Sequence, residues 1–237
     1  MKHRLPLLAL VLFTTLLTAF AQTAEAPYTL KLGEFSQIRI RHGIPVDYVC
    51  SNDSSGVITF TGSKELVEAL TFDLTTKGKL SISLEPRNFS GKINRVTVRS
   101  RQLTSIENEG DSVVRVLGIN SCPVFKAKQT GNGSISIRNI ESNQVEVACK
   151  LGHGSVTVNG KCDIAKLNCT GTGSILAGSL IANEVKCTVL GTGTVDCHAS
   201  QSLSIMGAGS GLVYYAGNPA DIKNRGAGVK IEAVDHQ

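Results

Sequence analysis

The chain has 237 residues, with 24 lysines and arginines against 19 aspartates and glutamates, and no tryptophan. This small basic excess, without a run of basic residues or interleaved aromatic residues, argues against a nucleic-acid partner. Serine, threonine, valine, isoleucine and glycine dominate and helix-forming residues are few, so the composition predicts an all-β protein.

The N-terminus has the features of an export signal. A basic start (residues 2–4) precedes an apolar run (residues 5–20), and Ala19-Phe20-Ala21 offers the small residues that signal peptidase accepts. We predict a signal peptide over residues 1–21 and an exported protein in the periplasm, at the cell surface or secreted. The alternative is an uncleaved anchor, although the run is shorter than the roughly 20 residues of a spanning helix. No later segment is apolar enough to span a bilayer as a helix.

Residues 22–104 are predicted to be rich in β-strands but to lack a regular repeat. Alternating or β-branched runs predict strands near residues 35–40, 46–49, 57–60, 80–84 and 96–98. A short helix is expected over Ser63–Leu70, because serine is a good N-cap residue and helix-forming residues follow it. This part would form irregular first coils, or a sheet that caps the more regular remainder.

Residues 105–237 contain a repeat of about twenty residues that is marked by Gly-x-Gly triplets. A unit of this length is too short for a pair of helices and fits one coil of stacked β-structure. We predict that the triplets are the corners of the coils, formed by Gly131, Gly133, Gly152, Gly154, Gly171, Gly173, Gly191, Gly193, Gly207, Gly209, Gly226 and Gly228.

The residues between the corners fall into columns when the sequence is aligned at a step of twenty. One column is apolar and consists of Phe125, Val145, Ala165 and Val185. The next is polar and consists of Lys126, Glu146, Lys166 and Lys186. Alternation within a unit predicts a strand with one buried side, and repetition between units predicts stacked coils. The predicted fold class is therefore an all-β solenoid, a parallel β-helix.

Seven cysteines in an exported chain raise the question of disulfides. Cys149 and Cys169 fall in an inward column on adjacent coils, about 4.8 Å apart, which permits a bridge. Buried free thiols that fill a narrow core are the preferred interpretation, and a Cys149–Cys169 disulfide is the alternative. No metal site or cofactor is expected, because there is no Cys-x-x-Cys and His153 and His198 lack a second ligand at a usable spacing.

Several motifs together resemble those of a known family. They are the opening Phe35-x-x-Ile38-x-Ile40, the glycine triplets, and the closing Gly211-Leu-Val-Tyr-Tyr-Ala-Gly217-Asn-Pro219, which is the most specific. The chain resembles the bacterial head GIN domain family, described as putative auto-transporter adhesin heads, from about Phe35 to Val229. The resemblance implies a right-handed parallel β-helix at the cell envelope without established catalytic residues. Thr, Ala, His or Asn stands where that family usually has Ser between the glycines.

Two outward clusters are candidates for chemistry. In the ladder Lys126, Glu146, Lys166 and Lys186, lysines that flank a glutamate could hold an anionic sugar, or the ladder is a set of surface ion pairs. The cluster Glu107, Glu109 and Asp111 would suit acid–base work, or it is a solvated acidic corner. Tyr214 and Tyr215 would cap the last coils; the alternative is that one of them stacks on a sugar ring, since alternation points the other inward. Nucleophile-elbow, phosphate-loop and zinc-protease motifs are absent from the sequence.

The sequence thus predicts a non-enzymatic, exported envelope protein that is adhesin-like or binds a ligand, either a glycan or an envelope or host protein. Two alternatives stay open. One is a carbohydrate-active β-helix enzyme that acts on acidic polysaccharide. The other is a structural envelope protein that self-associates end to end through exposed strand edges.

Overall fold

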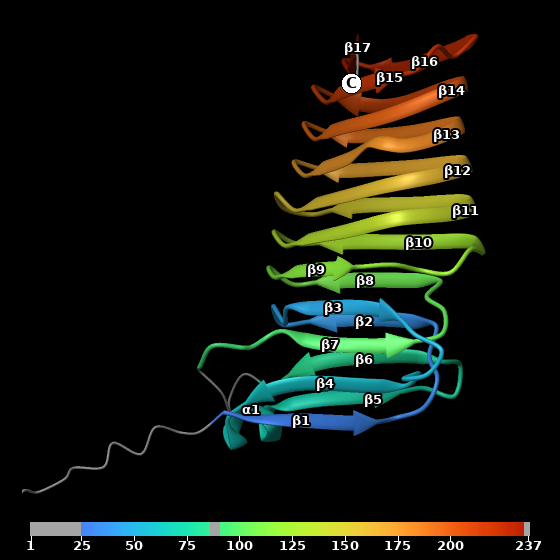
Figure 1. Ribbon diagram of the computed structural model, residues 1–237. Helices are drawn as coiled ribbons and strands as arrows, with labels where there is room; N and C mark the ends of the chain where they lie inside the picture. The colour runs from blue at the N-terminus through green and yellow to red at the C-terminus, as the bar shows by residue number, and fades with distance from the viewer. Residues whose placement is uncertain (1–24, 86–90, 235–237) are drawn as a thin grey trace, which may run out of the picture.

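The computed structural model describes residues 25–85 and 91–234, so the signal peptide predicted for residues 1–21 lies outside the described residues. Within this part the chain is nearly all β, with 17 strands and a single short helix. None of the described helical structure is long and apolar enough to cross a membrane. The strands stack as coils into a rod, which confirms the predicted all-β solenoid (Figure 1).

The N-terminal part is built from short strands and the helix α1 (Lys64–Ala69). The Ser63 hydroxyl accepts the N–H of Leu66, so the predicted helix and its N-cap are confirmed. The strands are β1 (Ala26–Lys31), β2 (Gln37–Arg41), β3 (Val46–Cys50), β4 (Val57–Gly62), β5 (Leu70–Leu74), β6 (Lys79–Leu84), β7 (Val96–Ser100), β8 (Ser105–Glu109) and β9 (Val113–Val116).

The remaining strands form the regular coils, in which each unit pairs in parallel with the next. The ladder shifts register inside β11, β12 and β13, where each strand turns a corner. The strands are β10 (Cys122–Thr130), β11 (Ser134–Lys150), β12 (Ser155–Gly171), β13 (Ser174–Gly191), β14 (Thr194–Gly209), β15 (Leu212–Ala216), β16 (Asp221–Ala227) and β17 (Lys230–Ala233).

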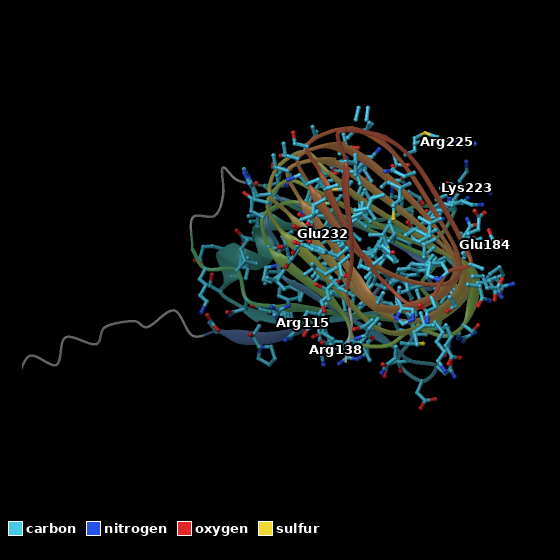
Figure 2. The ribbon with its side chains drawn as sticks, turned by 90° about the horizontal axis from the view of Figure 1, so that it is seen from above. Arg115, Arg138, Glu184, Lys223, Arg225 and Glu232 are labelled. Carbon is cyan, nitrogen blue, oxygen red and sulfur yellow. The ribbon has the colours of Figure 1, made fainter. Side chains whose placement is uncertain are left out.

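The coils present two opposite faces. The short face consists of β7, β3, β9, the starts of β11 to β14, β15 and β17. The long face consists of β6, β2, β8, β10, the ends of β11 to β14, and β16. Seen along the axis, Lys223 and Arg225 lie on one side of the coil and Arg115 and Glu232 on the other (Figure 2).

One coil is out of sequence order. β2 pairs in parallel with β6 on one side and β8 on the other, and β3 pairs with β7 and β9 in the same way. The β2–β3 coil is therefore inserted between two coils that follow each other directly along the chain (Figure 1). At the N-terminal end of the rod three pairs of strands are antiparallel: β1 with β4, β4 with β7, and β5 with β6. The helix α1 buries Leu66 and Ala69.

The core follows the predicted columns. Phe125 pairs with Val145, Val145 with Ala165 and Ala165 with Val185, and all four side chains are buried. The register read from the sequence is therefore confirmed. The largest fully buried side chains are the aromatic residues Tyr48, Phe35 and Phe125, and isoleucine, leucine and valine side chains fill the core along the described rod.

All seven cysteines are free thiols, so the structure has no Cys149–Cys169 disulfide. The Cys149 sulfhydryl donates to the Gly154 carbonyl oxygen at 3.2 Å, and that of Cys169 donates to the Gly173 carbonyl oxygen at 3.2 Å. Burial raises the pKa of the Cys169 thiol to about 11, which keeps it protonated at neutral pH. These thiols fill the core as small apolar side chains.

The corners need glycine for two different reasons. At the first position of a triplet, as at Gly171, φ is 109°, a conformation that disfavours residues with a Cβ. At the last position, as at Gly193, a Cβ would lie 2.4 Å from the Cys169 sulfur and 2.7 Å from the Gly173 carbonyl oxygen. The inward side chain of the coil below thus occupies the space that a larger residue would need.

The prediction of corners at Gly207 and Gly226 is wrong. Gly207 lies inside β14 and Gly226 inside β16, where the two residues pair with each other in the parallel ladder. The corner at that level is Gly209-Ser210-Gly211, whose first glycine pairs with Gly191 of the corner below, and the last corner begins at Gly228 with φ of 79°. Two triplets overlap in the sequence here and share Gly209, and the strand pairing shows that the second triplet forms the corner.

Candidate ligand-binding surface

The predicted ladder runs up the long face. Lys126, Glu146, Lys166 and Lys186 are successive partners in the parallel register. Glu146 lies between two lysines, with Oε2 2.9 Å from Nζ of Lys126 and Oε1 3.4 Å from Nζ of Lys166. Lys186 instead pairs with Glu184 on its own strand at 3.6 Å. The ladder is therefore one three-residue bridge and one separate pair.

Glu146 is held as a carboxylate. The Gln144 side-chain amide also donates to its Oε1 at 2.6 Å. The hydrogen bond from Lys126 lowers the pKa of Glu146 and outweighs the opposing effect of partial burial. A carboxyl group held in this way is a poor proton donor at neutral pH.

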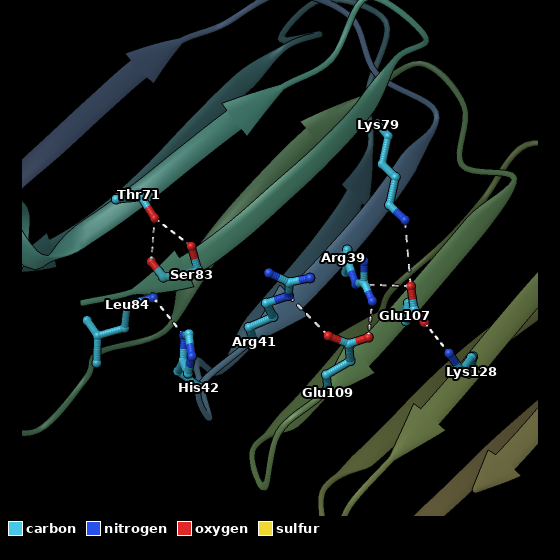
Figure 3. Close-up of polar contacts among 10 residues, drawn as sticks. All are labelled: Arg39, Arg41, His42, Thr71, Lys79, Ser83, Leu84, Glu107, Glu109 and Lys128. Carbon is cyan, nitrogen blue, oxygen red and sulfur yellow. Dashed lines mark hydrogen bonds and ion pairs between the residues drawn. The ribbon is translucent and has the colours of Figure 1, made fainter. Parts of the chain in front are cut away.

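Glu107 and Glu109, from the predicted acidic corner, lie in a network of ion pairs that crosses four coil layers of the long face (Figure 3). The hydrogen bond from Arg39 lowers the pKa of Glu109, and partial burial opposes it only in part. The pairs are Lys79–Glu107 (3.6 Å), Arg39–Glu107 (3.3 Å), Lys128–Glu107, Arg39–Glu109 and Arg41–Glu109 (3.1 Å).

Asp111, the third member of that corner, lies apart from this network. Its Oδ1 accepts the backbone N–H of Asn132 in the next coil at 3.1 Å. The three carboxylates thus do not form an acid–base pair, because two neutralise cations and one supports a corner.

The long face carries a large excess of cations. We count the charged residues in three adjacent outward columns, one through Lys126, one through Lys128 and one through Thr130, from β6 to β16. Their ten cationic residues are Lys79, Arg39, Arg41, Lys126, Lys128, Lys150, Lys166, Lys186, Lys223 and Arg225, and their three acidic residues are Glu107, Glu109 and Glu146. Among these, the four ladder members and Glu107 and Glu109 of the acidic cluster were singled out from the sequence, and the other cations were not.

A hollow interrupts this surface at Ala148. It has a volume of about 230 Å³, and its walls include Lys126, Lys128, Glu146 and Asn168. Ala148 stands in the column between Lys128 and Asn168, so a short side chain separates two longer ones. The alanine could be read from the sequence, but nothing in its spacing signals a hollow.

The short face differs in character. At the paired positions from β11 to β15 its outward side chains mainly carry hydroxyl groups, and Asp196 is the charged one among them: Ser134, Ser136, Ser155, Thr157, Ser174, Leu176, Thr194, Asp196, Leu212 and Tyr214. Tyr214 lines a hollow of about 300 Å³ with Leu176. Tyr215 points inward and packs, partly buried, against the core.

The two histidines considered as metal ligands lie on different coils. His153 is exposed at a corner, and His198 pairs with Ile181 and Ala216 in β14. Among the described residues, no group of three or more His, Cys, Asp or Glu side chains is placed to hold a metal ion.

Comparison with known proteins decides the family. The family profile described as "Putative auto-transporter adhesin, head GIN domain" matches residues 34–219. The chain belongs to the head GIN domain family. A search of curated proteins gives no match.

Solved structures share the fold of this head GIN domain chain. A putative adhesin from Bacteroides fragilis is 23% identical, with a TM-score of 0.79 over 89% of this chain and 97% of the other. A putative adhesin from Parabacteroides merdae is 18% identical, with a TM-score of 0.67 over 90% and 98%. A protein from Parabacteroides distasonis titled a putative lipid binding protein is 18% identical, with a TM-score of 0.67 over 89% and 98%. At these identities the likeness shows the fold alone.

Proposed function

We propose that this head GIN domain protein is a non-enzymatic, exported binding module of the cell envelope, and that the long face is its ligand-binding surface. The observation that carries the proposal is the excess of cations on that face: its three central columns hold ten cationic residues and three carboxylates, and the neighbouring column adds only two carboxylates, Glu184 and Asp221, which pair with Lys186 and Lys223. An excess of one sign on a single face attracts ligands of the opposite sign.

Export is supported by the basic and apolar N-terminus and by the adhesin description of the family. The ligand would be a glycan or a protein of the envelope or of a host. A rigid β-solenoid suits this role, because its register fixes the spacing of the outward side chains.

A carbohydrate-active enzyme is less well supported. Glu146 would be its most plausible acid or base, yet Lys126 and Lys166 hold that carboxyl ionised. Substitution of Glu146 and Lys166, with turnover measured on uronate polymers, tests this alternative. Turnover by the natural protein that is lost on substitution would favour the enzyme over the binding module.

A structural protein that joins end to end would use strand edges. Ile222 of β16 continues the inward column of Leu203 but is 44% exposed, which leaves apolar surface at that end of the described rod. Light scattering of the mature protein over a concentration series tests this alternative. A mass that grows steadily with concentration would support assembly as the main role.

The direct test of the proposal uses the exported protein, residues 22–237, on glycan arrays and against envelope extracts. A Lys126→Gln/Lys166→Gln variant serves as the charge-depleted comparison. We expect the natural protein to retain a ligand and the variant to retain less of it. Absence of binding to every array and extract would contradict the proposal.

A further inference from the structure

The hollow at Ala148 gives the long face a place where a ligand group can sit below the level of the surrounding side chains. Lys126 and Lys128 stand on one side of it, and Glu107, Glu146 and Asn168 also line it. Both lysine side chains reach solvent, with exposed fractions of 58% and 39%. An acidic group of a ligand that enters the hollow can reach the two ammonium groups from the solvent side, opposite the carboxylates of Glu107 and Glu146 with which they pair.

Each lysine head pairs with a neighbouring carboxylate. Lys126 pairs with Glu146 at 2.9 Å, and Lys128 pairs with Glu107. An ammonium group has three N–H donors, so each lysine keeps donors for a ligand while it holds its partner.

Beyond the hollow, cations alternate with side chains that can bond sugar hydroxyls. Lys166, Lys186 and Lys223 continue the column of Lys126. The amide and hydroxyl side chains beside them in the outward columns are Asn168, Thr170, Thr188 and Ser204. At about 4.8 Å per coil layer, the cationic columns from β6 to β16 extend for about 38 Å. This length suits a polymer better than a small molecule.

Two other polyanions fit the face less well. The three outward columns contain no aromatic residue among the described strands, so nucleobases would find nothing to stack on. Leu190 and Met206 are the large apolar residues exposed on these columns, so a lipid surface would meet mostly polar side chains.

We propose that the long face binds a linear acidic polysaccharide along the solenoid axis, with one acidic sugar in the hollow at Ala148. This inference rests on the proposed function, because it names the ligand class of that same face. The acidic groups meet Lys126, Lys128 and the lysines above them, and the sugar hydroxyls meet the amide and hydroxyl side chains between.

The test measures binding of residues 22–237 to polygalacturonate and to dextran, a neutral polysaccharide, at several salt concentrations. We expect binding to polygalacturonate alone, and an affinity that falls as salt rises, because ions screen exposed charges beyond about 10 Å at 0.1 M. Phosphatidylglycerol vesicles and single-stranded DNA are measured in parallel. Equal or tighter binding to dextran, vesicles or DNA would overturn the assignment to acidic polysaccharide.

Substitutions locate the site. Lys166→Gln should lower the affinity for polygalacturonate about fivefold, the effect of losing one exposed charge pair. Lys161→Gln is the matched control, because it removes the same charge from an exposed position of the same strand β12 outside the three columns. We expect it to change the affinity less than twofold. Equal effects of the two variants would show that only net charge matters, which contradicts a site on the long face.

Ala148 tests the hollow itself. Ala148→Gln fills it with a neutral side chain and should lower the affinity about tenfold, whereas Ala148→Ser keeps it open and should leave the affinity within twofold. Ala148 is outward, so both variants should fold, which far-UV circular dichroism checks. Unchanged binding by Ala148→Gln would overturn the role of the hollow. Binding to envelope extracts without binding to polygalacturonate would refute the polysaccharide assignment while leaving the proposed function intact.

Discussion

The inserted β2–β3 coil and the sequential coils from β10 to β14 hold their neighbours in different ways. In the sequential coils each unit leads directly into the next, and glycine corners let the chain stack closely on itself. The inserted coil has neighbours on both sides that are distant in sequence. Its ion pairs lie on both faces: Arg39 and Arg41 with Glu107 and Glu109 on the long face, and Asp47 with Arg95 and Arg115 on the short face.

The difference shows how a solenoid can place a coil out of order. In the sequential coils the short connection from one coil to the next limits which residues can pair. The alternation of side chains selects among these pairings, because a shift by one residue would carry every inward side chain outward. The inserted coil lacks this connection, and opposite charges at fixed register positions supply an additional preference for one pairing. Asp47 illustrates the point, since its carboxylate receives hydrogen bonds from Arg95 at 2.8 Å and from Arg115 Nε at 2.7 Å.

The largest effect is expected where the sequential coils stack at a corner. Gly193→Ala would place a Cβ 2.4 Å from the Cys169 sulfur, so we expect a loss of about 3 kcal/mol in the free energy of unfolding. Thr192→Ala, at the exposed middle of the same triplet, should change it by less than about 0.5 kcal/mol. Urea denaturation of both variants measures the difference. Equal stability would mean that the corners tolerate side chains.

A second mutation sharpens this result. Cys169→Ala removes the sulfur but leaves the Gly173 carbonyl oxygen 2.7 Å from the new Cβ. The double variant Gly193→Ala/Cys169→Ala should therefore lose less free energy of unfolding than the two single variants lose in sum, because the two residues share a contact. A strictly additive double variant would show that the sulfur is not what excludes the side chain.

The next largest effect is expected in the ion-pair network of the inserted coil. Glu107→Gln leaves Lys79, Arg39 and Lys128 without that carboxylate, and the Glu107 side chain is only 15% exposed. We expect a loss of about 2 kcal/mol. Glu184→Gln, in a sequential coil where the carboxylate is 45% exposed, should cost less than about 0.5 kcal/mol. Similar losses for the two variants in urea denaturation would remove the contrast between the coils.

Asp47 should make the inserted coil sensitive to acid. Burial raises the pKa of its carboxyl, but the hydrogen bond from Arg115 and the charge of nearby Arg95 together lower it by more. The pKa therefore lies below its ordinary value of 3.8. A depressed pKa stabilises the fold above the unfolded-state value, and this contribution is lost as pH falls through the folded-state value. Asp47→Asn should therefore cost about 1–2 kcal/mol at pH 7 and progressively less below about pH 4.

Denaturant unfolding of the natural protein and the Asp47→Asn variant from pH 7 to pH 3 measures this dependence. The two stability curves should converge on the acid side. A gap that stays constant over the whole range would show that the carboxylate does not contribute through its charge.

The same distinction explains what the sequence could predict. The columns through Phe125 and Lys126 were predictable, because each sequential coil restarts after a glycine triplet and aligns at a nearly constant step. The strand around Ile38 was also predictable, but its pairing with β8 was not, because an alternating pattern identifies a strand without identifying its partner. The place of Arg39 on the long face was therefore hidden, along with the extent of that face.

The smallest effect on stability is expected at Glu146, and it separates the two roles of the long face. Lys126 and Lys166 are 58% and 40% exposed, so loss of their shared carboxylate in Glu146→Gln should cost less than about 1 kcal/mol. Both lysines would then be free of their acidic partner, and the affinity for polygalacturonate should rise about threefold. Titration of the variant and the natural protein with the polymer measures this change. A fall in affinity would instead mean that Glu146 contacts the ligand or orients its lysines, which would give the carboxylate a positive part in binding.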